Sequence, residues 1–165
     1  MEKSPELLAI HEAGRAITAC VLQRRFEQVS ISPNSSSVDL DTPLAELDDQ
    51  QLLARWLEEK VLVGLGGAAS EAFHTSHSDR VIQTLVQDYG VVGQDVSRLL
   101  PLVGGSDDPG ARDILVLSLW ERVLKLLNTH WGAVTVLSDL LRDLETVGWV
   151  EVCEIFEHTT RWRTH

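Results

Sequence analysis

The chain has few basic residues. Its 14 lysines and arginines stand against 25 aspartates and glutamates, which gives a formal net charge of −11 over 165 residues. Binding to nucleic acid or to an anionic membrane needs a basic stripe that neutralises phosphates, so we expect neither partner. The acidic residues between Asp39 and Asp49 indicate a solvated surface.

Long apolar runs and phosphate-binding loops are also missing from the sequence. No run approaches the roughly 20 apolar residues of a membrane-spanning helix, and no leader-like segment precedes the first helical pattern. We therefore expect no membrane insertion and a cytoplasmic location. No G-x-x-x-x-G-K-[ST] segment occurs, so we expect no ATP binding by that route.

Cysteine is scarce, with one residue near each end, Cys20 and Cys153. Both lie in apolar helical patterns, which favours reduced core thiols over a disulfide or a metal pair. The length fits a single domain over residues 1–165, enough to bury about two-thirds of the unfolded surface.

Apolar residues at helical spacing dominate what is present. The first helix begins at Ser4, a good N-cap followed by a proline, and its apolar residues cover most of its circumference, as in a buried helix. Alternation over 26–32 and around Val38 and Leu40 predicts short strands. The expected fold class is mainly α, a helical domain with a small two- or three-stranded β element. The further helical patterns cover about 48–73 (or from Pro43), 78–89, 94–102, 111–128, 130–145 and 149–160.

The second of these helices contains a patch of small residues, from Gly64 to Ser70. Each glycine inside a helix costs about 1 kcal/mol relative to alanine, so some other interaction must compensate. Small residues allow a neighbouring helix to approach closely, and we expect such packing here.

The first helix carries the segment His11-Glu12-Ala13-Gly14-Arg15. In the H-E-x-x-H motif of zinc peptidases, two histidines one helical turn apart bind the metal and the glutamate acts as general base. Arg15 stands in the second histidine's place, with five donors, no lone pair and a permanent positive charge. The motif thus has the base but lacks one metal ligand.

Three segments together resemble the peptidase domain of FtsH-type ATP-dependent zinc metalloproteases, particularly stand-alone relatives without the ATPase. His11 to Ala16 matches that family's H-E-A-G-H-A segment in all but the second histidine, and Leu65 to Glu71 is similar to its L-G-G-R-A-A-E helix. The stretch from His130 to Val152 is similar to its C-terminal helices. The resemblance implies an FtsH-peptidase-like fold over nearly the whole chain.

The resemblance also implies site residues. His11 would be the first zinc ligand and Glu12 the base, now vestigial. The family's aspartate ligand falls on Asp95, which follows a glycine and opens a helical pattern, or alternatively on Asp79, which lies nearer the family's usual separation. His74 and His77 are possible substitute ligands, or else belong to a polar loop with exposed histidines.

We expect Arg15 to replace the charge of the metal, by pairing with Glu12 or with the aspartate. Zinc is the cofactor of the family that the chain resembles, and we do not expect zinc in this chain. The resulting hypothesis is a domain without proteolytic activity that binds a protein or peptide as a regulatory module. The alternatives are an active zinc metallopeptidase using His11, Asp95 or Asp79 and a substitute histidine, and a purely structural helical domain.

Overall fold

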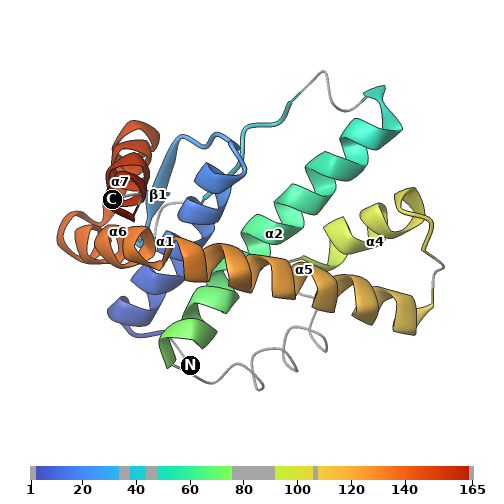
Figure 1. Ribbon diagram of the computed structural model, residues 1–165, viewed down its shortest axis with the longest axis horizontal. Coiled ribbons are helices and arrows are strands. Elements are labelled where there is room, and N and C mark those ends of the chain that lie inside the picture. The colour runs from blue at the N-terminus through green and yellow to red at the C-terminus, as the bar shows by residue number, and fades with distance from the viewer. Residues whose placement is uncertain (1–2, 34–37, 44–47, 76–91, 106–107, 164–165) are drawn as a thin grey trace.

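The structure is a computed structural model that describes residues 3–33, 38–43, 48–75, 92–105 and 108–163. It is mainly helical with one small sheet, as the sequence predicts (Figure 1). The described elements are α1 (Pro5–Val21), β1 (Gln28–Ser30), α2 (Gln50–Thr75), α4 (Gly93–Leu102), α5 (Pro109–Thr129), α6 (Trp131–Leu144), β2 (Thr146–Gly148) and α7 (Trp149–Arg163).

Helix α1 is the central helix of the fold. The Ser4 hydroxyl accepts a hydrogen bond from the Leu7 backbone N–H at 3.2 Å, which confirms the predicted N-cap. Ten of its 17 residues are buried, from Ala9 onwards. The helix can be buried on several sides because α2, α5, α6 and α7 all pack against it.

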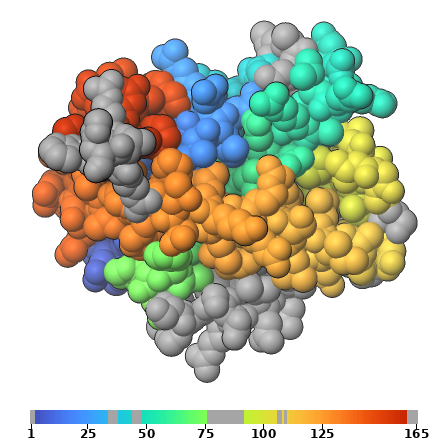
Figure 2. All heavy atoms as spheres, viewed as in Figure 1, coloured from blue at the N-terminus to red at the C-terminus, as the bar shows by residue number. Residues whose placement is uncertain are grey.

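The other helices surround the crossing of α1 and α2. Figure 1 shows α6 and α7 on one side of this pair and α4 on the other. Helix α5 packs along α2, and its side chains form a band across the visible face in Figure 2. The single residue His130 caps the end of α5 and the start of α6, so these two helices follow each other directly.

The small-residue patch of α2 packs against α1, as expected. A Cβ atom added at Gly14 would lie 2.5 Å from the Gly66 carbonyl oxygen, and one added at Gly66 would lie 2.6 Å from Thr18 Oγ1. The Thr18 hydroxyl in turn donates to the Gly14 carbonyl at 2.7 Å. The two backbones meet where neither has a side chain, which gives the compensation that the glycines need.

The sheet differs from the prediction. Strand β1 pairs antiparallel with β2, with Val29 opposite Val147. The expected second strand around Val38 and Leu40 forms one isolated bridge, between Leu40 and Phe26. The helix predicted over roughly 130–145 is confirmed as α6, which ends at Leu144; Glu145, with a φ of 64°, then turns the chain into β2. Its carbonyl then accepts from the Ile31 N–H.

The remaining helices lie within a few residues of their predicted positions. The predicted helix over 78–89 lies outside the described residues. None of the described helices is long and apolar enough to cross a bilayer.

The packing of Gly14 generates a first prediction. We expect Gly14→Ala to lower the free energy of unfolding by about 1–3 kcal/mol, because a backbone carbonyl cannot move aside as a flexible side chain can. Denaturant titration measures the change.

Gly132→Ala in α6 is the matched control, since a Cβ atom there meets nothing within 4 Å. This variant is expected to be neutral or more stable by about 0.5 kcal/mol, because alanine favours helix. Equal effects of the two substitutions would contradict the close crossing.

Candidate metal-motif site

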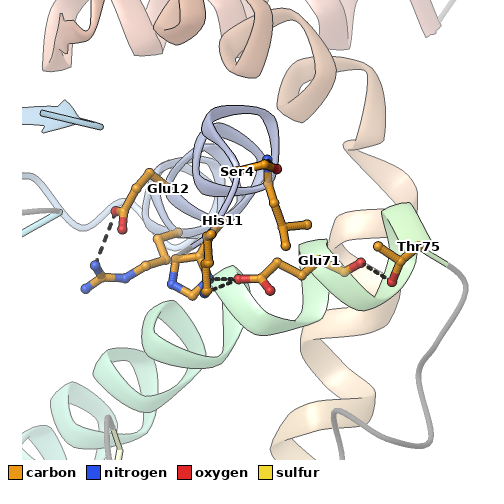
Figure 3. A network of polar contacts seen from close by, with 8 residues as sticks. Ser4, His11, Glu12, Glu71 and Thr75 are labelled. Atoms are coloured by element: carbon orange, nitrogen blue, oxygen red, sulfur yellow. Dashed lines mark hydrogen bonds and ion pairs between the residues drawn. The ribbon is translucent and has the colours of Figure 1, made fainter. Parts of the chain in front are cut away.

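The motif residues project from α1 in two directions. Figure 3 shows His11 directed toward Glu71 of α2, whereas Glu12 leaves α1 in another direction and does not face Glu71. Both side chains are largely buried: His11 is 18% exposed and Glu12 is 8% exposed. The expected inward placement of the motif is therefore present.

His11 forms a carboxylate–histidine pair with Glu71. Its Nδ1 atom lies 2.5 Å from Glu71 Oε1. Lys3 Nζ lies 3.1 Å from the same ring nitrogen and also bonds Glu71. Because a carboxylate only accepts hydrogen bonds, Nδ1 donates in this contact, and a neutral ring with its proton there would have its lone pair on Nε2. Carboxylates orient metal-binding histidines in the same way.

Gly67 of α2 makes room for the His11 ring. A Cβ atom at Gly67 would lie 2.5 Å from Cε1 and Nε2 of the imidazole. Glu71 follows Gly67 by one helical turn, so the same face of α2 both supports the ring and supplies its carboxylate partner.

Glu71 is ionised at neutral pH. Burial alone would raise the pKa of its carboxyl, but hydrogen bonds from His11 and Lys3, together with their charges, outweigh burial and hold this pKa below its usual value. Lys3 thus supplies a fixed positive charge on this side of α1.

Glu12 pairs with Arg15. Arg15 Nη1 lies 3.3 Å from Glu12 Oε2, with the Arg15 side chain 15% exposed. Arg15 Nη2 also donates to the Val38 carbonyl at 3.0 Å, which ties the segment after β1 to α1. An ion pair of Arg15 is expected from the sequence, and in the structure Glu12 is a partner of its guanidinium.

Asp95 lies in the first turn of α4 and pairs with Lys60 of α2, at 3.5 Å between Nζ and Oδ1. Lys60 precedes Gly67 by seven residues, so its backbone lies about 10 Å further along α2 on the same face. The structure therefore places Asp95 beside Lys60 of α2.

His74 lies in the last turn of α2 and its Nε2 is 3.6 Å from Glu6 Oε1 of α1. Its side chain is 37% exposed. The other candidate histidine, His77, and the alternative aspartate, Asp79, lie outside the described residues.

The described donors do not fit the catalytic zinc that the family resemblance implies. A catalytic site uses three protein ligands and an open position. In the part of the chain that the structure describes, no group of three or more His, Cys, Asp and Glu side chains is placed to hold a metal ion. Arg15 and Lys3 add two positive charges around His11 and Glu12, and both would repel a divalent cation.

Sequence reasoning missed the roles of Glu71 and Lys3. Glu71 belongs to the segment that carried the resemblance, and its spacing of four residues from Gly67 is the signal that could have identified it. Lys3 precedes the helix, and its contact with Glu71 depends on how α1 crosses α2. That crossing is a tertiary feature with no local signature.

Comparison with known proteins agrees with the resemblance at a coarse level. No family model matches the chain. The ATP-dependent zinc metalloprotease FtsH 2 of Salinibacter ruber (strain M8) is 24% identical to this chain over an alignment 191 residues long. The alignment covers 96% of this chain. The chain spans 28% of the length of that relative. The similarity supports a distant relationship to FtsH proteins.

The Glu12–Arg15 pair generates a second prediction. We expect Arg15→Met to lower the free energy of unfolding by about 1–3 kcal/mol, because it leaves the Glu12 carboxylate buried without its cation. The double variant with Glu12→Gln should recover part of that loss. A double-mutant cycle by denaturant titration measures the coupling.

Arg25 and Asp41 are the matched control pair. Their charged groups lie 3.7 Å apart but their side chains are 73% and 61% exposed. The same cycle should give a coupling below about 0.5 kcal/mol there. A coupling at Glu12–Arg15 no larger than that of the control would show that this ion pair does not matter to the fold.

Proposed function

We propose that the chain is an FtsH-related, metallopeptidase-like protein that lacks catalytic zinc and proteolytic activity and serves as a binding or regulatory module. The observation that carries this proposal is the ion pair of Arg15 with Glu12. In the family motif that the sequence resembles, a histidine at position 15 would hold the metal. Here the same position supplies a cation to the carboxylate that would be the base.

The charge arrangement supports the proposal. Two carboxylates, Glu12 and Glu71, each have their own cation, in Arg15 and Lys3. A divalent metal normally compensates such carboxylates, and side-chain cations do so here through hydrogen bonds. The interior therefore needs no metal charge to be stable. A cytoplasmic location, expected from the composition, is part of the same proposal.

The binding activity we propose lies at the β1 edge. Trp149 N–H donates to the Glu27 carbonyl and Ile31 N–H to the Glu145 carbonyl, so alternate residues of β1 turn their backbone groups toward β2. Gln28 turns its backbone groups to the opposite edge. On the described part of that edge, Phe26 forms a bridge with Leu40. An extended peptide could add there as a strand.

An active zinc metallopeptidase is the second candidate. The pair of His11 with Glu71 favours it, since a neutral His11 ring that donates from Nδ1 to the carboxylate would have its metal-binding lone pair on Nε2. This enzyme would need a histidine ligand in place of the one missing at position 15, either His74 or His77. It would also need an aspartate ligand, either Asp95 or Asp79. The metal content of the purified protein separates the two candidates.

We expect the purified wild-type chain to contain far less than one zinc per molecule and to leave casein intact with or without a chelator. Elemental analysis and a protease assay measure these properties. Arg15→His should not restore cleavage, because it removes the partner of Glu12 while the remaining donors still do not form a site. Stoichiometric zinc together with chelator-sensitive cleavage, abolished by Glu12→Gln, would establish the enzyme instead.

The β1 edge can be tested with peptides selected against the chain from a displayed library. Gln28→Pro should weaken their binding at least tenfold, because proline removes the outward N–H and is tolerated at a sheet edge. Gln28→Ala keeps the N–H and is the control, expected to bind as the wild type does. Titration calorimetry measures both, and equal affinities would place the peptide elsewhere.

A further inference from the structure

A short segment after β1 folds back onto the outer edge at which that strand begins. In this segment, residues 38–41, which we call the strap, Leu40 forms an antiparallel bridge with Phe26. The Asp41 N–H donates to the Arg25 carbonyl at 2.8 Å. At the other end of the strap, the Val38 carbonyl accepts a hydrogen bond from Arg15 Nη2 at 3.0 Å. The backbone of the strap is therefore held at both ends.

The side chains of the strap alternate as those of an edge strand do. The two apolar residues, Val38 and Leu40, pack against the core. The two acidic residues, Asp39 and Asp41, are exposed. The Asp41 carboxylate lies 3.7 Å from Arg25 Nε. The strap thus covers the edge with apolar side chains inward and acidic side chains outward.

We propose that the strap occupies the peptide site of the β1 edge, and that the ligand is an extended peptide of alternating apolar and acidic residues that displaces the strap. The inference rests on the proposed function, and it gives that edge a class of peptide and a means of regulation. Apolar side chains of the ligand replace Val38 and Leu40, and a carboxylate replaces that of Asp41 beside Arg25. A carbonyl of the ligand accepts from Arg15.

The two ends of the strap are held unequally. At one end, Val38 is buried and its carbonyl is bound to the largely buried Arg15. At the other end, the side chains of Asp41 and Arg25 are 61% and 73% exposed, and an ion pair this exposed contributes little. Displacement of the strap therefore begins at Asp41.

The groove has more room than the strap fills. A cavity of about 560 Å³ is lined by Asp41 of the strap together with Arg25, Phe26 and residues at the start of α7, among them Trp149. A ligand with larger side chains can bury apolar surface in this cavity, in addition to the contacts that it takes over from the strap. These added contacts offset the high effective concentration of a competitor that belongs to the same chain.

The test on the wild-type chain uses a synthetic peptide with the sequence of residues 38–43. Calorimetry should detect its binding, and serines in place of its valine and leucine should weaken binding at least tenfold. Asparagines in place of its aspartates should weaken binding about twofold to fourfold, as expected for an exposed ion pair. Saturating peptide should speed hydrogen exchange at the Asp41 amide, since that amide loses its acceptor, and should leave the amides of α1 unchanged.

Leu40→Ser loosens the strap without altering β1. We expect this variant to bind the peptide about fivefold to twentyfold tighter than the wild type, because the edge is free for a larger fraction of the time. Asp39→Asn is the matched control, since Asp39 is an exposed residue of the same segment. It should bind the peptide as the wild type does.

The outcomes separate this inference from the proposed function. Peptide binding that Gln28→Pro weakens, with unchanged exchange at Asp41 and equal affinities for Leu40→Ser and the wild type, would overturn the strap and leave the β1 edge as a peptide site. Failure of both this peptide and library-selected peptides to bind either protein would overturn both proposals. The exchange measurement needs no variant, so it decides the question even where Leu40→Ser does not fold.

Discussion

The close crossing of α1 and α2 is the contact on which the rest of the structure depends. Gly14 and Gly66 let the two backbones approach, and the crossing sets which residues of α2 face the motif on α1. It places Gly67 under the His11 ring and Glu71 beside its Nδ1 atom. The other helices then cover the remaining sides of α1, so that residues along most of its length become core.

The motif in this setting is a pair of charge-compensated carboxylates. Arg15 compensates Glu12 and Lys3 compensates Glu71. His11 lies against a carboxylate, and the residue one turn later on α1 is a cation. A 24% identical relative named a zinc metalloprotease therefore does not decide the activity of this chain.

Particular residues show which features of the fold could be predicted from the sequence and which could not. Ser4 and Pro5 predicted where α1 begins because capping is a local property of the chain. Strand β2 was missed because three residues of strand between two helices give no periodic signal, and its start depends on the positive φ of Glu145. The pairing of Asp95 with Lys60 could not be predicted, since it depends on where α4 packs along α2.

By itself, the sequence determined the helical class, the limits of most helices and the presence of a cation, Arg15, one turn after His11, because periodicity, capping and side-chain chemistry are local properties of the chain. The tertiary structure decided that Glu71 and Lys3 join His11 and that Asp95 pairs with Lys60. These contacts join residues on different helices or at the ends of the chain. They exist because burial of the apolar faces fixes how the helices cross, and no local pattern encodes that geometry.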